Sequence, residues 1–238
     1  MNPKGKRAVL LGGTSGIGLA AAGQLQNKGA EVIVLSRSES NHARARDALG
    51  ADAEIRVLDV LDREAMAVTF SELAPFDILV NAATGGERAT GPFLKMDLDG
   101  FQGSFRKLWG YVNSVRLGAE HLPEDGCIVL VSGAPARKCR PGMSAISTVG
   151  NAVEGFTRAI AGEIAPRRIN VVSPGIIDTP MFPMEGEARE AFLQQASANT
   201  LLRRAGTADE VASGILFVIE NDFVTGTTID VDGGALLP

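Results

Sequence analysis

Seven short apolar segments alternate with longer segments that have the period of an amphipathic helix, and this alternation constrains the fold of the 238-residue chain most. The short segments are apolar on both faces, like buried strands of a parallel sheet, and cover residues 8–11, 32–35, 55–58, 78–80, 128–131, 169–172 and 228–231. Strands that alternate with helices form a mainly parallel sheet with helices on both faces. We therefore predict one doubly wound α/β domain over residues 1–238, with its ligand beyond the carboxyl ends of the strands.

The composition excludes several classes of protein. Hydrophobic residues make up 45% and charged residues 21% of the chain, and the net charge is −5, so we expect neither a disordered protein nor a nucleic-acid partner. A domain of this size does not need its two cysteines for a disulfide, which favours a cytoplasmic location. His42 and His121 lack the nearby partners of a zinc site, and no apolar stretch reaches the roughly 18 residues of a membrane span. We expect no metal and no membrane contact.

A glycine-rich segment follows the first predicted strand and leads into a helix, and it reads Gly12-Gly13-Thr14-Ser15-Gly16-Ile17-Gly18. Gly12 allows a sharp turn, Gly16 lets the backbone approach a pyrophosphate, and Gly18 lets the helix pack on the sheet. The helix N-terminus adds free N–H groups and the positive end of its dipole. Because a second strand follows, we predict a phosphate-binding loop, with a structural turn as the alternative.

Three further motifs accompany this loop: Leu79-Val80-Asn81-Ala82-Ala83, residues 170–180, and residues 226–234. Together they resemble the short-chain dehydrogenase/reductase family over nearly the whole chain, although Leu11, Ala82 and Thr84 depart from its pattern. The resemblance implies a Rossmann-type fold and a bound nicotinamide dinucleotide. It places the cofactor against Gly12, Thr14, Ser15, Gly16, Ile17, Ser36, Arg37, Ser38, Asp59, Val60, Asn81, Ala82, Pro174, Gly175, Ile177 and Thr179.

The end of the second predicted strand indicates which dinucleotide binds. An acidic residue there holds the ribose 2′-hydroxyl of NADH, whereas an arginine attracts the 2′-phosphate of NADPH. This chain has Ser36-Arg37-Ser38 and no acid at that point, so we predict NADP(H). A solvated arginine at a helix start is the alternative. Asp59 matches the family position that binds the adenine amino group, but it could equally cap the helix that follows.

The resemblance also indicates where the family's catalytic serine, tyrosine and lysine would lie, and this chain has other residues at those three positions. Aligned on residues 152–157, these positions fall on Gly133, Ile146 and Gly150, whose side chains cannot move a proton. Tyr111 is the only tyrosine in the chain and precedes all three positions, so no gap restores the tyrosine and lysine motif.

A lysine and a tyrosine do occur together on the preceding predicted helix. Lys107 falls where the family has an asparagine, and Tyr111 lies one helical turn further on. A nearby ammonium lowers the pKa of a phenol, so this pair is a candidate proton donor; Lys107 alone, partly desolvated, is another. The alternatives are that Tyr111 is an aromatic residue at a subunit interface and that Lys107 fills space left by the missing side chains.

Two other segments border the predicted site. Residues 181–204 show no clear period between two strands, and we expect them to form a substrate lid. The basic segment 137–140 would attract an anionic substrate, with a solvated loop as the alternative. Ser132, Ser144 and Ser147 have no base in view, and we expect them to cap helices or bond to the backbone.

These observations favour an NADPH-dependent oxidoreductase that acts on a small carbonyl or conjugated substrate, with Lys107 and Tyr111 as candidate catalytic residues. The basic segment leaves an anionic substrate open. Two alternatives stay open. One is an inactive NADPH-binding scaffold or sensor, and the other is a cyclase or isomerase with a structural dinucleotide. The family resemblance implies a homodimer or homotetramer, with which Phe105, Trp109 and Gly110 on one helix agree.

Overall fold

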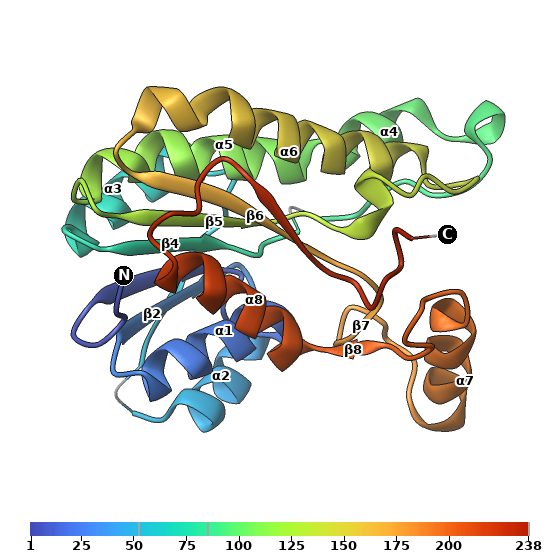
Figure 1. Cartoon of the computed structure of the whole chain (residues 1–238), viewed down its shortest axis with the longest axis horizontal. Coiled ribbons are helices and arrows are strands. Elements are labelled where there is room, and N and C mark those ends of the chain that lie inside the picture. The colour runs from blue at the N-terminus through green and yellow to red at the C-terminus, as the bar shows by residue number, and fades with distance from the viewer. Residues whose placement is uncertain (52, 85, 238) are drawn as a thin grey trace.

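Seven strands form one parallel sheet in the order β3-β2-β1-β4-β5-β6-β9 in the computed structural model, which describes residues 1–51, 53–84 and 86–237 (Figure 1). The strands are β1 (Arg7–Leu11), β2 (Glu31–Ser36), β3 (Glu54–Val57), β4 (Ile78–Asn81), β5 (Cys127–Val131), β6 (Arg168–Pro174) and β9 (Thr228–Val231). All neighbouring pairs are parallel, and the predicted strands lie within two residues of the observed ends. The predicted doubly wound α/β fold is confirmed.

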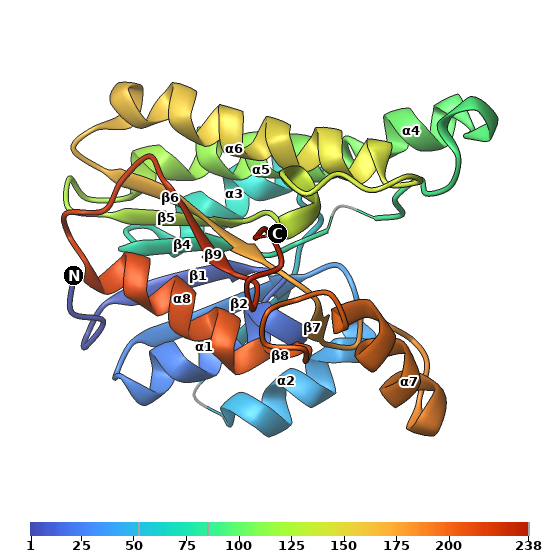
Figure 2. The same cartoon turned by 45° about the vertical axis from the view of Figure 1, so that its right-hand side comes forward.

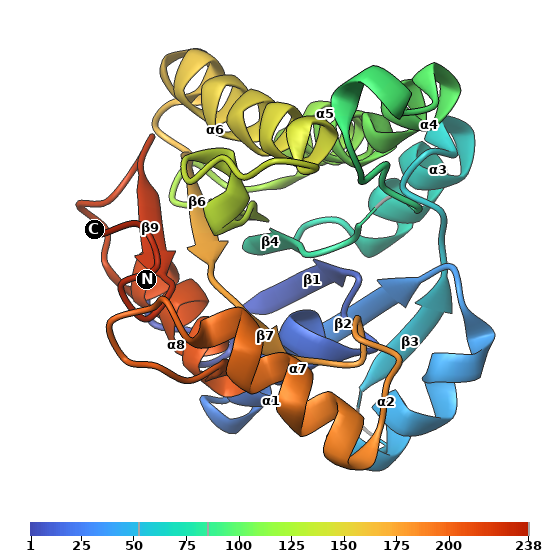
Figure 3. The same cartoon turned by 90° about the vertical axis from the view of Figure 1, so that its right-hand side faces the viewer.

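Helices cover both faces of the sheet (Figures 1 and 3). One face carries α1 (Gly16–Asn27), α2 (His42–Leu49) and α8 (Ala208–Glu220); the other carries α3 (Arg63–Leu73), α4 (Leu98–Ser104), α5 (Arg106–Gly118) and α6 (Ser144–Ile164). Short 3-10 turns are η1 (Glu39–Asn41), η2 (Phe93–Lys95), η3 (Ala119–His121) and η4 (Ala134–Ala136). None of the helices within the described ranges is both long and apolar enough to span a membrane.

The strands divide their side chains between two cores because successive residues point to opposite faces. Leu10, for example, packs toward α1 and α8, whereas Val9 and Leu11 pack toward α3 and α5. This explains the apolar residues on both faces of the central strands, as in parallel strands that are covered on both sides.

Side-chain caps fix where several helices begin. Asp62 accepts from the Ala65 backbone N–H before α3, and Asp97 accepts from Gly100 before α4. Thr207 and Glu210 form a reciprocal capping box at the start of α8. Each cap satisfies N–H groups that the helix itself leaves without a partner.

The carboxyl ends of the strands meet at one edge of the sheet, and the strand order reverses between β1 and β4. Beyond this edge, α7 (Gly186–Ser197) stands apart from the sheet with the short strands β7 (Ile177–Asp178) and β8 (Gly206–Thr207) (Figure 2). Residues 181–204 therefore contain a helix, where the sequence showed no period. Only Ser197 of α7 is buried, so the helix lacks the apolar face that makes a helix recognisable in a sequence.

Candidate active site

The glycine-rich loop has the geometry of a phosphate cradle. Gly12 and Gly16 have φ angles of +75° and +50°, a region that favours glycine. A Cβ on Gly18 would overlap the Gly12 carbonyl, so the loop closes tightly onto the first turn of α1. The first turn of α1 holds no acidic residue, and the Ser15 hydroxyl makes no cap hydrogen bond. The N-terminus of α1 therefore offers its N–H groups to an anion.

The loop after β6 lies directly over this cradle. A Cβ built on Gly16 would stand 3.4 Å from Cβ of Thr179, which is itself buried. At the base of the loop, the Gly175 N–H donates to the Val231 carbonyl at 3.1 Å. The structure thus brings two predicted cofactor segments, residues 12–18 and 174–179, to one place at the carboxyl edge.

The predicted 2′-phosphate site lies at the end of β2. The side chain of Arg37 is 52% exposed, and its guanidinium approaches a carboxylate oxygen of Asp59 only to 3.9 Å, so it can turn toward a phosphate. Asp59 also accepts from the Leu61 N–H at 2.9 Å, in the turn before α3. It does not cap that helix, as the sequence alternative supposed, because Asp62 holds the cap position. The Ser36 hydroxyl accepts from the Ser38 N–H at 3.2 Å.

Two of the predicted cofactor residues use their side chains elsewhere. The Asn81 amide donates to the Ser114 hydroxyl at 2.9 Å and accepts from the Ala83 N–H at 3.0 Å. Because it is fully buried and bonded, this amide fixes the loop after β4 instead of reaching a ligand. The Val60 side chain packs against Gly110 on α5, and its carbonyl accepts from the Asn113 amide at 3.0 Å.

At the position that the family resemblance assigns to the catalytic lysine, two small residues pack tightly. A Cβ on Gly150 would stand 2.8 Å from Cβ of Ala136. The Ser132 hydroxyl donates to the Gly150 carbonyl at 3.3 Å, and Ser144 contacts the Met96 sulfur. Ser147 and Ser173 differ, since their buried hydroxyls have no partner among the described residues. The expectation of backbone hydrogen bonding is therefore wrong for Ser147.

Lys107 is the one lysine that is buried among the residues the structure describes. The side chain projects from the start of α5, and its ammonium donates to the Ser132 carbonyl, just beyond β5, at 3.3 Å. The ammonium also lies 5.4 Å from the centroid of the Tyr111 ring. Burial, together with the positive charge of Arg88, lowers the pKa of Lys107 from 10.5 to about 7. This lysine can therefore exchange a proton near neutral pH.

Tyr111 does not behave as the displaced catalytic tyrosine. Its hydroxyl donates to the Val131 carbonyl at 2.7 Å, and the residue is only 1% exposed. Burial raises the pKa of the phenol far above its usual value of 10.0, and neither the hydrogen bond to Val131 nor the charge of Arg88 offsets this effect. The expected lowering of this pKa is corrected, because a phenol deep in an apolar core cannot ionise without losing solvation.

In the basic segment 137–140, the first two cations have partners within the protein. The Arg137 guanidinium forms ion pairs with Glu154 on α6 and Asp230 on β9. Lys138 donates to the Leu237 carbonyl at 3.1 Å. The first two cations of the segment are thus occupied by the protein itself, and the argument that they attract an anionic substrate is withdrawn. Gly110 also differs from expectation, because it packs on Val60 and not on an exposed face.

Arg88 is absent from the predicted site residues, because it lies in a loop without period or motif. Its guanidinium contacts the Met181 sulfur at 3.0 Å, at the start of the segment predicted as a lid. The next residue, Ala89, is held by a 2.8 Å hydrogen bond from its N–H to the Ser104 hydroxyl on α4. Only the three-dimensional structure shows that the charge of Arg88 acts on Lys107.

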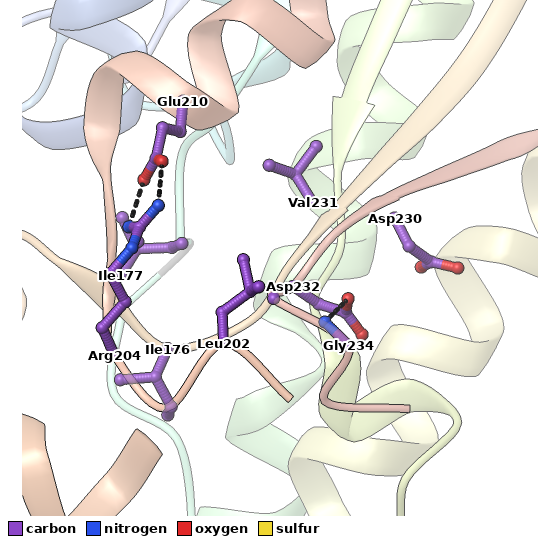
Figure 4. A pocket seen from close by; sticks show the side chains of 11 residues that line it. Ile176, Ile177, Leu202, Arg204, Glu210, Asp230, Val231, Asp232 and Gly234 are labelled. Atoms are coloured by element: carbon purple, nitrogen blue, oxygen red, sulfur yellow. Dashed lines mark hydrogen bonds and ion pairs between the residues drawn. The ribbon is translucent and has the colours of Figure 1, made fainter. Parts of the chain in front are cut away.

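A separate cavity of about 310 Å³ lies beside β7 and the C-terminal segment (Figure 4). Its lining is apolar at Ile176, Ile177 and Leu202, and an Arg204–Glu210 ion pair crosses one side. The Asp232 carboxylate accepts from the Gly234 and Leu236 N–H groups. These charged groups are already partnered, so the cavity does not select a charged ligand. Within the described ranges, no three His, Cys, Asp or Glu side chains gather as a metal site would require.

A parallel sheet with a glycine-rich loop, a helix N-terminus and a covering loop at its carboxyl edge defines a dinucleotide-binding α/β protein. A protein-family model described as enoyl-(acyl carrier protein) reductase matches residues 12–235. The chain belongs to the short-chain dehydrogenase/reductase family.

Similar proteins extend this assignment over the full length. Galactitol 2-dehydrogenase from Rhizobium johnstonii is 34% identical in an alignment of 245 positions, gaps included, that covers 97% of this chain and 95% of that protein. A small-chain dehydrogenase crystallised with NADPH shares 31% identity and a TM-score of 0.84, covering 99% of this chain and 100% of the other. BdcA, also solved with NADPH, gives 30% identity and a TM-score of 0.83 over 98% and 94% of the two chains.

Proposed function

We propose that this protein is an NADPH-dependent oxidoreductase that acts on a small carbonyl or conjugated compound, with Lys107 as its proton donor. The observation that carries the proposal is the buried Lys107 ammonium at the end of β5, where its pKa falls to about 7. General acids work best when their pKa lies near the working pH.

The chain's own residues fit NADPH. Backbone N–H groups of residues 12–18 would hold the pyrophosphate, Arg37 the 2′-phosphate, and the loop at 174–179 the nicotinamide end. When bound, the nicotinamide supplies or accepts the hydride. Two similar structures contain NADPH, which supports the choice of cofactor.

Lys107 would transfer the proton that accompanies the hydride. In reduction, one N–H bond of the ammonium breaks as a proton passes to the alkoxide oxygen, and water then reprotonates the neutral amine. The donor must be protonated at the start, so the rate of reduction should fall as pH rises through about 7. In oxidation the amine accepts the proton, and the dependence on pH is reversed.

Two measurements test this function. NADPH should quench the fluorescence of Trp109 or raise the melting temperature more than NADH does. A panel of carbonyl compounds, followed by absorbance of the reduced cofactor, then tests turnover. Lys107→Met should reduce kcat/KM by at least about 100-fold without loss of NADPH binding.

The same assays separate the alternatives. Tight NADPH binding with no turnover on any carbonyl would favour the scaffold or sensor. Turnover without change in cofactor absorbance would favour a cyclase or isomerase. Undiminished oxidoreductase activity in Lys107→Met would remove Lys107 from the chemistry.

We also propose that the protein forms a dimer or tetramer through α4 and α5. Trp109 on α5 is 52% exposed and Leu98 on α4 is 72% exposed, an unusual apolar surface for a monomer. Light scattering of the wild type and of Trp109→Lys would test this, since the variant should dissociate. A wild-type protein that is monomeric at micromolar concentration would contradict it.

A further inference from the structure

We propose that Met181 is a site of reversible oxidation by peroxide, and that its sulfoxide binds Arg88 and holds the segment 181–204 over the cofactor. This inference goes beyond the proposed reaction, because it concerns the release of the cofactor and not the transfer of a proton.

The contact between Arg88 and Met181 pairs a strong donor with a weak acceptor. A guanidinium N–H of Arg88 donates to the Met181 sulfur at 3.0 Å. A thioether sulfur is a poor hydrogen-bond acceptor, whereas a guanidinium carries five N–H donors and a permanent positive charge. Any change that places an oxygen on this sulfur therefore strengthens the contact.

Met181 is also accessible to a small oxidant. The residue is 50% exposed, and it is the only one of the six methionines that is exposed in the part of the chain that the structure describes. Two of the others are buried and three are half-buried. Because the sulfur lone pair must meet the oxidant, we expect peroxide to attack Met181 first.

The oxidation is a two-electron step. The sulfur attacks one oxygen of hydrogen peroxide, so that an S–O bond forms while the O–O bond breaks. The hydroxide that leaves takes up the proton of the transferred hydroxyl and becomes water. The sulfur is oxidised to the sulfoxide, and the peroxide is reduced. The sulfoxide oxygen then accepts a charge-assisted hydrogen bond, which is roughly twice as strong as a neutral one.

Both sides of the contact are fixed to the rest of the protein. On one side, the Ala89 N–H donates to the Ser104 hydroxyl on α4 at 2.8 Å. On the other side, Arg189 on α7 donates to the Thr179 carbonyl at 2.9 Å, two residues before Met181. A stronger contact would therefore join two supported loops and would not be absorbed by free chain movement.

The contact lies beside the cofactor crevice. Thr179 lies against Gly16 of the phosphate loop. Arg88 belongs to the loop that follows β4, the neighbour of β1 at the point where the strand order reverses and ligands bind. A covering segment must move before a bound cofactor leaves. Oxidation of Met181 should therefore slow the release of NADPH.

The test uses the full chain with Cys139→Ser as the parent protein, because the exposed thiol of Cys139 would also react with peroxide. The parent is treated with hydrogen peroxide, catalase removes the excess, and peptide mass spectrometry measures oxygen uptake at each methionine. NADPH is then bound and displaced by NADP⁺, and its fluorescence gives the dissociation rate. We expect Met181 to be oxidised first and dissociation to slow at least about fivefold. Methionine sulfoxide reductases of both stereospecificities should restore the original rate.

Four variants assign the effect. Arg88→Leu should still be oxidised at Met181 but should release NADPH at its unoxidised rate, and Arg88→Lys should be slowed less than the parent. Met181→Leu should not respond to peroxide. Met184→Leu, in the same segment, is the matched control and should respond like the parent.

Two results would overturn the inference. Oxidation of Met181 no faster than that of the half-buried methionines would remove the site. Unchanged or faster release after Met181 is oxidised, or equal slowing in Arg88→Leu, would remove the bridge to Arg88.

Digestion by chymotrypsin tests the same bridge without cofactor. The oxidised parent should be cleaved after Phe192 in α7 at least about threefold more slowly than the untreated parent, and Arg88→Leu should show no such change. Neither readout involves turnover, so failure of the proposed chemistry of Lys107 would leave this inference intact. A protein that reduces carbonyl compounds but responds to peroxide in neither assay would lose this inference alone.

Discussion

Lys107 and Tyr111 lie one helical turn apart, a spacing at which an ammonium would lower the pKa of a phenol. Burial instead dominates the pKa of both groups. Desolvation penalises the charged form of each group, so the pKa of the lysine falls and that of the tyrosine rises. The attraction expected between an ammonium and a phenolate never develops, because the phenol stays neutral. The tyrosine ring instead supports the ammonium with its face.

Tyr111→Phe tests this division of roles. We expect kcat/KM to change less than about threefold, while the free energy of unfolding falls by about 1 kcal/mol because the Val131 carbonyl loses its donor. Steady-state kinetics and urea unfolding measure the two effects. A 100-fold loss of activity in a protein of normal stability would return the hydroxyl to the chemistry.

Arg37 determines the choice of dinucleotide in our proposal. Arg37→Ser should weaken NADPH binding at least about tenfold and leave NADH binding within twofold, since charge-assisted hydrogen bonds to phosphate are strong. Titration of Trp109 fluorescence gives both affinities. Arg44→Ser, at an exposed position on α2, is the matched control. Equal losses for the two dinucleotides would contradict the role of Arg37.

At the scale of elements, η4 and α6 approach too closely for a larger residue between them. Gly150→Ala should destabilise the protein by about 1–3 kcal/mol, because its Cβ would lie 2.8 Å from that of Ala136. Adding Ala136→Gly should recover at least half of that loss. Urea unfolding of the two single variants and the double variant forms a cycle. Strictly additive effects would show that the contact is relieved by backbone movement.

Arg189 ties α7 to the loop after β7. Its guanidinium donates to the Phe182 carbonyl at 2.6 Å and to the Thr179 carbonyl at 2.9 Å, and it pairs with Asp178. Thr179 in turn lies against Gly16, so the predicted lid and the phosphate loop share one support.

Arg189→Ala should therefore loosen residues 181–204. We expect chymotrypsin to cleave after Phe192 at least about fivefold faster, and NADPH affinity to fall a few-fold, because local opening exposes the site. Mass spectrometry of timed digests identifies the cut. Arg158→Ala, which removes an exposed arginine from α6, should digest like the wild type.

For the molecule as a whole, charge burial predicts how stability depends on pH. The pKa of Lys107 is lower in the folded chain than its ordinary 10.5, so the unfolded chain binds more protons between about pH 7 and 10.5. The contribution of this residue to the free energy of unfolding should therefore rise with pH in that window, by about 1 kcal/mol per pH unit. Chemical unfolding at pH 7, 8 and 9 gives the free energy of unfolding of the wild type and of Lys107→Met. As the pH rises, the value for the wild type should increase relative to the value for the variant. A constant difference between the two values would indicate that Lys107 has an ordinary pKa.

The sequence predicts the sheet well because each strand is apolar on both faces and ends at a turn, so local pattern and burial agree. It predicts the phosphate loop because Gly12 and Gly16 adopt positive φ angles and Gly18 packs too closely for a side chain. The helix α7 and the role of Arg88 could not be predicted, since one has no apolar face and the other depends on a neighbour distant in sequence. The pKa of Tyr111 depends on depth in the core, which spacing along a helix does not reveal.

The contact between Ala136 and Gly150 also restricts the order in which substitutions can accumulate. Any side chain at position 150 begins with a Cβ, which would stand 2.8 Å from the methyl carbon of Ala136. Such a substitution should therefore be tolerated better after Ala136→Gly than before it. Sequences that carry a side chain at position 150 are accordingly expected to carry glycine at position 136.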